Sequence, residues 1–367
     1  MDFAFNEEQA ELRQAVHQVF EAECPVSALR AFESADAEGR AALARARWGV
    51  VAGLGAPALV VPESAGGLGL SDVDLVGILE EAGWAALPEP LLETAALAAP
   101  TLATLLPAPT AGTSLDELLN GATVAVGGID VGVGGPTSPT TVAPDGMLHT
   151  PRVSGALTAG LFLLACRDAD SGWQLHIVPA SSCSVIPTPA LDPTRDLSSV
   201  TWPLSSDTLL AYGVAAEALV QLLADRAAAG SAALLIGLAD RMITLAADYA
   251  KDRRQFGQPI GSFQAVKHLL ANARVKLEFA RPATYRAAWS LATAQPTVSH
   301  DASMAKAMAS DAADLAARVA LQVHGAIGYT WECDLHFFMK RTWALSRAWG
   351  DAPTHRRLVL AQARAGH

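Results

Sequence analysis

The stretch "DRRQFGQPIGSFQAVKH", Asp252 to His268, gathers the residue types that bind a phosphate-bearing ligand. Arg253 offers a planar, permanently charged guanidinium, which matches the oxygens of a diphosphate. Gln255 and Gln264 can reach ribose or pyrophosphate oxygens, and two glycines in the stretch allow a close approach of the backbone. The stretch therefore predicts contacts to a nucleotide diphosphate at a turn between helices.

A second stretch with similar chemistry is "QVHGAIGY", Gln322 to Tyr329. Gly325 and Gly328 end the helical pattern before it and can expose backbone amides to an anion. Each stretch alone is also compatible with an ordinary helix terminus, the first with a surface arginine pair, and His324 with a hydrogen-bonded structural residue. The presence of both stretches favours the nucleotide interpretation.

Composition limits the possible partners. The chain has 367 residues, 51% of them apolar, which is enough for a sizeable core. Its formal charge of -11 argues against nucleic acid and against an anionic membrane surface. The N-terminus lacks the order of a signal peptide, and the run "AALLIGLADRM" meets Asp240 and Arg241 before membrane-spanning length. We therefore expect no membrane span and a cytoplasmic location.

The four cysteines have no ligand spacing. Without a neighbouring histidine pattern they indicate reduced structural thiols and predict no metal site. They are Cys24, Cys166, Cys183 and Cys333.

Three zones must position these residues. Residues 1–120 carry helical patterns, the first with Asn6 as its N-cap. Residues 121–206 alternate short β-branched or apolar runs with Gly, Pro, Asp and Ser, which is typical of a small β domain. Residues 207–367 are helical and so widely apolar that they indicate a buried four-helix bundle. The predicted fold class is α+β, mainly α.

Four motifs in this order resemble the acyl-CoA dehydrogenases. They are "MDFAFNEEQAELRQAV", "LGAPALVVPESAGGLGLSDVDLVGILEEAG", "RRQFGQPIGSFQAVKH" and "QVHGAIGYTWE". The resemblance covers nearly the whole chain. It implies an FAD-dependent oxidoreductase of fatty acid or steroid catabolism that desaturates an acyl-CoA thioester between Cα and Cβ. It also implies a tetramer and electron-transfer flavoprotein as the electron acceptor.

The resemblance also assigns cofactor contacts. In the family, the last two motifs reach the ADP half of a flavin held by a neighbouring subunit. The residues implied here are Arg253, Arg254, Gln255, Phe256, Phe263, Gln264, Gln322, Val323, His324, Gly325 and Ala326.

The other half of the flavin site departs from the family. Members carry a stretch like "TEPGAGSD" and a Trp-Ile-Thr/Ser strand, which hold the isoalloxazine ring. The corresponding stretches here are "GIDVGVGGPTSPTT" and "VSGALTAGLFLLACR", and no tryptophan precedes a hydroxyl residue in the second. We expect Gly132, Gly134 and Gly135 to form a flexible loop.

The catalytic base is missing from its two family positions. Desaturation needs a carboxylate to remove the α-proton while hydride leaves the β-carbon. Most members place a Glu in Tyr-Glu-Gly-Thr, where Trp349, Gly350 and Asp351 align. A minority place it upstream, where Ala227 aligns. Asp351 can be a displaced base or the cap of the helix that follows.

Other charged residues have structural interpretations. We expect His355 and Arg356 on a solvated helix face. For Glu80 and Glu81, at a helix end, we expect solvation or a salt link.

Three functional hypotheses fit this pattern. The chain can be a subunit of a heterotetramer in which a second acyl-CoA dehydrogenase-like chain supplies the isoalloxazine contacts and the base, as in actinobacterial members that act on steroid side chains. It can be a self-sufficient homotetramer that uses Asp351. It can be a non-catalytic scaffold that binds flavin or acyl-CoA. Only the first explains both the retained and the missing motifs.

Overall fold

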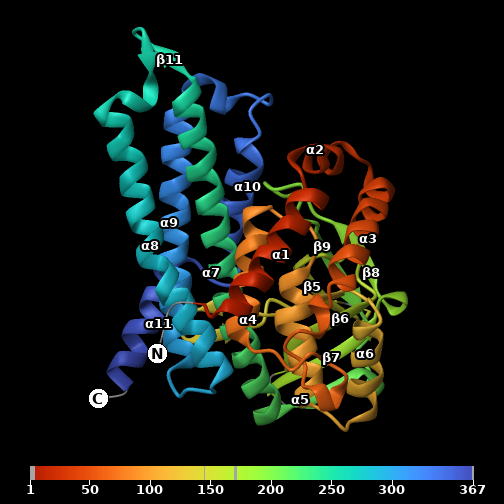
Figure 1. Cartoon of the computed structure of the whole chain (residues 1–367). Helices are drawn as coiled ribbons and strands as arrows, with labels where there is room; N and C mark the ends of the chain where they lie inside the picture. Colours follow the sequence, from red (N-terminus) through yellow and green to blue (C-terminus); the bar gives the residue numbers. More distant parts are fainter. Residues whose placement is uncertain (1–4, 144, 169–171, 366–367) are drawn as a thin grey trace. The chain divides into compact units, whose positions relative to one another are not determined.

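A computed structural model describes residues 5–143, 145–168 and 172–365 (Figure 1). The chain divides into two compact units. The first comprises Met1–Leu29, Val76–Leu87 and Ala228–His367, and the second Arg30–Leu75 and Pro88–Ala227. The sequence boundaries after residues 120 and 206 stay a prediction.

Helices build the first unit. It contains α1 (Glu7–Glu23), most of α4 (Asp72–Trp84), the second part of α7 (Gly213–Asp252), α8 (Gln264–Ala292), α9 (Val298–His324), α10 (Leu335–Leu345) and α11 (Ala352–Ala365). Asn6 caps α1 as predicted, because its side chain accepts the backbone N–H of Gln9 at 2.8 Å. In Figure 1, α7, α8 and α9 run side by side as a bundle.

Small residues allow this bundle to pack tightly. The buried face of α9 consists largely of alanines, so its backbone approaches its neighbours closely. The backbones of α4 and α7 come very close to each other at Gly83 and Gly237. A Cβ at Gly83 would lie 2.1 Å from the carbonyl oxygen of Leu234, and one at Gly237 would lie 1.8 Å from that of Glu80. No side chain fits at either position.

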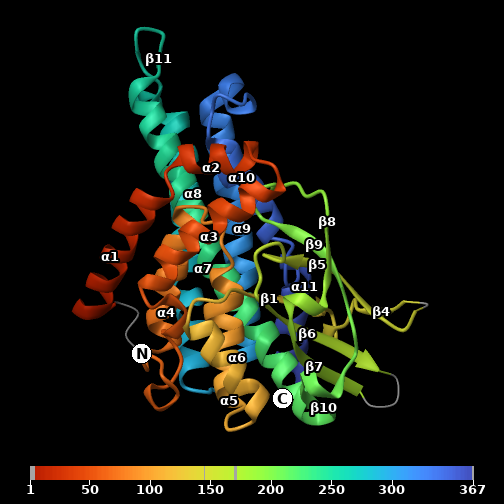
Figure 2. The same ribbon diagram turned by 90° about the vertical axis from the view of Figure 1, so that its right-hand side faces the viewer.

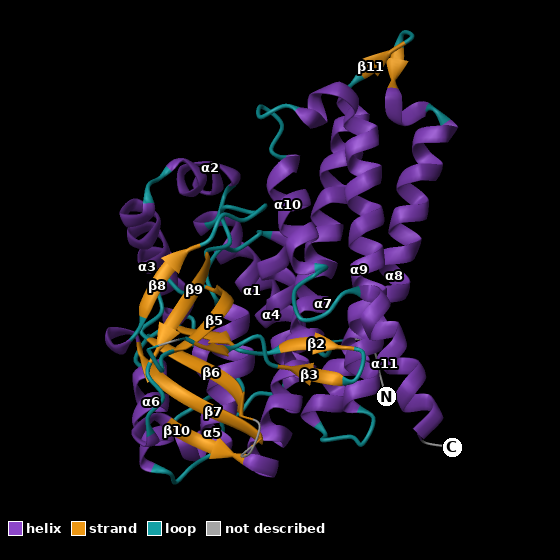
Figure 3. Ribbon diagram, turned by 180° about the vertical axis from the view of Figure 1, so that it is seen from behind, coloured by secondary structure: helices purple, strands orange, loops and turns teal. Residues whose placement is uncertain are grey.

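The second unit combines short helices with two larger sheets and a two-stranded hairpin. Its helical segments are most of α2 (Val26–Ser34), α3 (Ala37–Gly53), η1 (Ala56–Ala58), η2 (Glu63–Ala65), η3 (Leu92–Ala98), α5 (Ala99–Thr104), α6 (Pro109–Leu119), η4 (Ala180–Ser182), η5 (Ser206–Thr208) and the first part of α7. Figure 3 shows the strands in orange.

Each sheet has four strands. One has the order β1 (Val124–Gly127), β6 (Leu161–Asp168), β7 (Gly172–Pro179), β10 (Leu209–Tyr212), with only the β1–β6 pair parallel. The other is antiparallel, in the order β4 (Thr141–Val142), β5 (Leu148–Ser154), β9 (Leu197–Trp202), β8 (Ser184–Pro187). Phe162, Val178, Val200 and Trp202 belong to the buried cluster that joins the two sheets.

The predicted α+β, mainly α fold is confirmed, but the prediction for Gly132, Gly134 and Gly135 is wrong. The glycines expected in a flexible loop instead form a hairpin of β2 (Asp130–Gly132) and β3 (Gly135–Thr137). Gly135 has φ +107°, which a glycine adopts without strain, so the same residues that predict flexibility also permit a tight turn.

Helix α7 is long and apolar enough to cross a membrane by length and composition. However, 83% of its most apolar window is buried inside the protein, as in the core helix of a bundle.

All four cysteines are free thiols, as predicted. Burial raises the pKa of Cys166 and of Cys183 to about 11, so both stay protonated and unreactive at neutral pH.

Candidate functional site

The first predicted nucleotide-binding stretch forms a hairpin at one end of the bundle. After α7, β11 (Arg254–Gln255) pairs with β12 (Gln258–Pro259), and η6 (Ile260–Ser262) leads into α8. The turn residues Phe256 and Gly257 have φ +51° and +80°, the signs of a type I′ turn. Figures 1 and 2 show this hairpin at the tip of α7 and α8.

The side chains of the hairpin point into solvent. Phe256 is 92% exposed, although it is a large apolar residue with positive φ, an unfavourable backbone conformation for its type. Its ring contacts Phe263 edge to face, at 6.1 Å between centroids. Phe256 therefore presents its ring to solvent from a strained turn.

The hairpin also offers cationic and amide donors. Arg253, Arg254, Gln255 and Gln264 are all exposed. Arg254 donates from Nη2 to the carbonyl of Gly257 at 3.1 Å, which orients its guanidinium. The Arg253 guanidinium has no hydrogen-bond or ion-pair partner within the described part of the chain, so all its N–H groups are available to a ligand.

The second nucleotide-binding stretch lies beside the hairpin. Helix α9 ends at His324, and Gly325, with φ +63°, starts η7 (Gly325–Tyr329). The ring of Tyr249, near the end of α7, stacks on His324 with 4.5 Å between centroids. His324 Nδ1 donates to the carbonyl of Ala320 at 2.8 Å. His324 is therefore hydrogen-bonded within the fold, which agrees with its structural interpretation. The Tyr249–His324 stack also links the two predicted nucleotide-binding stretches.

The residues of the second stretch differ in accessibility. Gln322 and Ala326 are exposed, whereas His324 and Gly325 are half-buried. Val323 is 7% exposed and packs in the bundle, so only its backbone could face a ligand.

These two stretches fit the ADP side of a dinucleotide. The guanidinium groups of Arg253 and Arg254 match the charge of a pyrophosphate. The amide side chains of the two stretches can hydrogen-bond to the hydroxyls of a ribose. The exposed ring of Phe256 supplies an apolar surface.

The stretches that correspond to the isoalloxazine side have different chemistry. Asp130 of β2 and Arg152 of β5 form an ion pair at 2.6 Å. Arg152 has φ +57°, another strained position for a residue with a side chain. Asp130 lies in the first of these stretches and Arg152 directly precedes the second. The region therefore presents a charged pair of side chains that bond to each other, and this does not fit a neutral, planar ring.

Asp351 caps a helix. The turn before α11 passes through Trp349 and Gly350, both with positive φ, and places Asp351 as the N-cap. Its Oδ1 accepts the backbone N–H of Thr354 at 2.9 Å. Hydrogen bonds from the side chain and the backbone of Thr354 lower the pKa of the exposed Asp351 carboxyl, which makes it a weaker base.

His355 lies in the core, so the predicted solvated face is wrong for this residue. It is 2% exposed, and its Nε2 donates to the carbonyl of Trp349 at 2.8 Å. Burial lowers the pKa of His355 to about 4, so it is neutral at pH 7. The neighbouring Arg356 is exposed, as predicted, and forms an ion pair with Asp311.

The second family position for a base holds no carboxylate. Ala227 is fully buried, and the preceding Arg226 binds both carboxylate oxygens of Asp72 at 2.5 and 3.2 Å. Asp225 accepts a hydrogen bond from Gln221 at 3.1 Å. This stretch is therefore used for structure.

Glu80 and Glu81 form salt links, one of the two predicted alternatives. Arg13 of α1 donates to Glu81 at 2.5 Å, and His17 bonds the same carboxylate at 2.6 Å. Tyr285 of α8 donates to Glu80 at 2.8 Å. The pair joins α1, α4 and α8.

Sequence reasoning missed two contacts. Tyr249 precedes Arg253 by four residues, which is about one helical turn. The spacing could therefore have predicted that Tyr249 lies on the same face of α7, one turn before the hairpin. Nothing in the sequence pairs Asp130 with Arg152, because the contact depends on how two separate strands meet.

Two family descriptions match the chain. "Acyl-CoA dehydrogenase, N-terminal domain" covers residues 6–105, and "Acyl-CoA dehydrogenase, C-terminal domain" covers residues 215–363.

Three known proteins show the range of similarity. IpdE2, an acyl-CoA dehydrogenase of Mycolicibacterium smegmatis, is 35% identical over 295 residues, which are 78% of each chain. FadE34, an acyl-CoA dehydrogenase of Mycobacterium tuberculosis, is 34% identical over 93% of this chain but only 45% of its own length. A variant of the Tcur3481–Tcur3483 steroid ACAD is 27% identical, with a TM-score of 0.83 over 98% of this chain and 99% of that chain.

Proposed function

The chain belongs to the acyl-CoA dehydrogenase family, and from this premise we propose that it contributes the ADP side of an FAD site to a partner chain in a heteromeric acyl-CoA dehydrogenase. FAD is the cofactor of this family. The partner, a second chain of the same family, supplies the isoalloxazine contacts and the catalytic base.

The exposure of the hairpin carries this proposal. Ligand sites bury most of their ligand in a concave pocket. The hairpin with Phe256 is convex and solvent-exposed, and its residues Arg253, Arg254 and Gln255 lie in water. A dinucleotide held by these side chains alone would remain largely solvated. A second protein surface is needed to enclose it.

Each retained residue has a role in holding the cofactor. Arg253 and Arg254 neutralise the pyrophosphate, and their positive charges favour the bound nucleotide by charge-assisted hydrogen bonds. Gln255 and Gln264 orient the ribose, and Phe256 covers an apolar face of the nucleotide. When bound, FAD accepts the hydride that leaves the β-carbon of the acyl thioester.

The base comes from the partner in this proposal. Removal of an α-proton is favoured by a carboxylate whose pKa is raised towards neutrality. The pKa of Asp351 is lowered instead, and its oxygen already accepts a backbone N–H. The Asp130–Arg152 ion pair likewise supports the proposal that the partner chain, not this one, supplies the isoalloxazine contacts.

Two of the similar proteins support a partner chain. The steroid ACAD is named as a pair of chains. FadE34 is long enough for a second unit of this size, because the matched region covers only 45% of it. We further propose a bulky acyl-CoA, such as the thioester of a steroid side chain, as the substrate, and electron-transfer flavoprotein as the acceptor.

Co-production with the partner tests the proposal. The first partner candidate is a second acyl-CoA dehydrogenase-like chain with an intact Glu, encoded beside this one. Light scattering and flavin absorbance are measured on the chain alone and on the co-purified complex. We expect a colourless chain alone, and with the partner a tetramer of about two copies of each chain with about two flavins. A yellow, active homotetramer from this chain alone would refute the proposal.

A further inference from the structure

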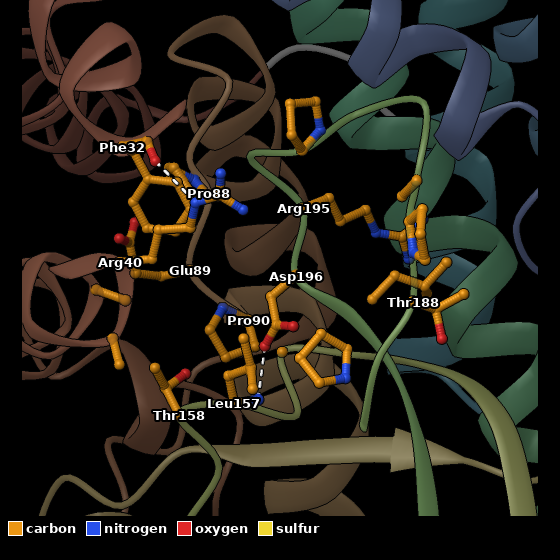
Figure 4. A pocket seen from close by; sticks show the side chains of 18 residues that line it. Phe32, Arg40, Pro88, Glu89, Pro90, Leu157, Thr158, Thr188, Arg195 and Asp196 are labelled. Atoms are coloured by element: carbon orange, nitrogen blue, oxygen red, sulfur yellow. Dashed lines mark hydrogen bonds between the residues drawn. The ribbon is translucent and has the colours of Figure 1, made fainter. Parts of the chain in front are cut away.

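The second unit contains a cavity of about 340 Å³ that the flavin proposal does not use. One wall comes from α2 and α3, and the opposite wall from the β5–β6 and β8–β9 connections. Figure 4 shows Phe32 and Arg40 on the helical side, and Arg195, Asp196 and Thr188 on the strand side. The volume is that of a small-molecule site.

Prolines make the walls apolar and stiff. A proline has a fixed φ and no N–H group, so it offers neither flexibility nor a backbone donor. Phe32 and Leu157 add larger apolar surfaces. The prolines that line the cavity are Pro88, Pro90, Pro187, Pro189 and Pro193. Such a cavity favours a rigid, apolar body.

Arg40 places a positive charge in this apolar setting. Its Nε donates to the carbonyl of Phe32 at 3.1 Å, and its Nη2 donates to the carbonyl of Glu33 at 2.9 Å. Within the described part of the chain it forms no direct ion pair, although its charge acts on the carboxyl of Asp196 in the same lining. The two bonds hold the guanidinium in place, and its remaining N–H groups are available.

The acids of the cavity have other partners. Glu89 accepts a hydrogen bond from Arg47, which does not line the cavity, at 2.7 Å. Asp196 accepts the backbone N–H of Leu157 at 2.6 Å and the hydroxyl of Ser198 at 3.1 Å. Burial raises the pKa of the Asp196 carboxyl, and its hydrogen bonds and the nearby charge of Arg40 oppose this effect.

The lining contains a second arginine, Arg195, as well as the carboxylates of Glu89 and Asp196. Arg195 donates from Nε to Ser154 Oγ at 3.1 Å, and its Nη2 lies 3.8 Å from a carboxylate oxygen of Glu93. Arg195 is therefore held by other groups, and Arg40 is the better placed of the two to bind an anion.

We propose that this cavity binds a small organic anion, a rigid apolar ring system with one carboxylate, and that Arg40 is its anionic anchor. The prolines and Phe32 contact the ring system, and the guanidinium pairs with the carboxylate. The inference uses none of the residues assigned to FAD, so it stands or falls separately from the heteromeric function.

A matched pair of probes tests the charge requirement. 2-Naphthoate carries the ring system and the carboxylate, and 2-naphthamide is its neutral counterpart of nearly the same shape. Both are titrated into the full chain, as purified or in complex with its partner, and followed by calorimetry. We expect 2-naphthoate to bind at least about tenfold more tightly, as one charge-assisted contact predicts. Equal affinities, or no binding of either probe, would overturn the proposal.

Three variants test the assigned positions. We expect Arg40→Gln to weaken 2-naphthoate binding by about tenfold or more. We expect Asp196→Asn to strengthen it, because the change removes a negative charge from the lining but keeps an acceptor for Leu157. Ala41→Phe fills the cavity from α3 and should abolish binding, which keeps the proposal testable if Arg40→Gln fails to fold. Thermal unfolding checks the fold of each variant.

Arg45 provides the matched control. It lies on the same helix, is exposed, and lines a neighbouring cavity instead. Arg45→Gln should change the affinity less than twofold. Loss of binding in Arg45→Gln with retention in Arg40→Gln, or weaker binding in Asp196→Asn, would place the anion elsewhere and overturn the proposal.

Discussion

The ring of Tyr249 stacks on the ring of His324, with 4.5 Å between centroids and 20° between planes. One residue precedes the exposed hairpin and the other precedes the η7 turn. Since both stretches are proposed to contact one nucleotide, this stacked pair fixes their relative position. A ligand that bridges them would meet a site already arranged, which reduces the ordering cost of binding.

Replacement of Tyr249 tests this coupling. Tyr249→Ala removes an aromatic contact of about 0.5–1.5 kcal/mol and should lower both the thermal midpoint of the chain and the flavin content of the complex. Tyr249→Phe keeps the stacked ring and is the control, with expected flavin content close to wild type. Full flavin occupancy in Tyr249→Ala would show that the two stretches hold their positions without the pair.

Arg253 should determine flavin occupancy without affecting folding. Arg253→Ala deletes an exposed guanidinium that bonds to no group among the residues that the structure describes, so stability should change by less than about 0.5 kcal/mol. Each lost charge-assisted hydrogen bond to the pyrophosphate is worth about 1.5–3 kcal/mol, so flavin should dissociate during gel filtration. Arg318→Ala, at another exposed arginine of the same unit, is the control. Unchanged absorbance per chain in Arg253→Ala would remove Arg253 from the site.

Asp351 should matter for stability and not for turnover. Asp351→Asn keeps an N-cap acceptor, so activity of the complex and the unfolding midpoint should both stay near wild type. Asp351→Ala removes the acceptor for Thr354 and should cost about 1 kcal/mol of stability. A rate loss of about a hundredfold in Asp351→Asn, with flavin retained, would make Asp351 the base and favour the homotetramer.

The Asp130–Arg152 pair gives a further test. Both side chains are about half exposed, at 47% and 57%, so Arg152→Ala should change stability by less than about 1 kcal/mol. We propose that this chain holds no flavin ring of its own because it lacks the residues that contact the isoalloxazine. Removal of the ion pair does not restore those residues, so it should not add flavin to the complex. A rise from about two towards four flavins per tetramer would identify the pair as the cause.

The sequence predicts those features that depend on local pattern. Asn6 begins α1 as expected, because a capping box is encoded within four residues. The bundle follows from the apolar runs. A turn between helices was predicted at Asp252–His268, but not the pairing of β11 with β12 around Phe256 and Gly257. The burial of His355 was not predicted, because the charged residues beside it in the sequence suggested an exposed face. Whether His355 is buried depends on which face of α11 packs against α9. The stack of Tyr249 on His324 depends in the same way on the packing of two helices.

Two buried histidines predict how the stability of the protein depends on pH. Burial lowers the pKa of His176 to about 4, as for His355, against about 6.5 for an ordinary histidine. As the pH falls below 6.5, the unfolded chain takes up these protons and the folded chain does not until about pH 4. The stability contributed by neutral burial is therefore complete above pH 6.5 and is lost towards pH 4. The expected loss is about 1.4 kcal/mol per pH unit for each histidine.

Urea unfolding at pH 7.5, 6 and 5 measures this dependence. His355→Gln retains a donor for the carbonyl of Trp349 but cannot take up the proton, so its stability should fall about 1.4 kcal/mol less per pH unit than that of the wild type. His268→Gln, which changes an exposed histidine of α8, is the surface control. If His355→Gln and the wild type lose stability in parallel between pH 6 and 5, then His355 is not held neutral by the fold.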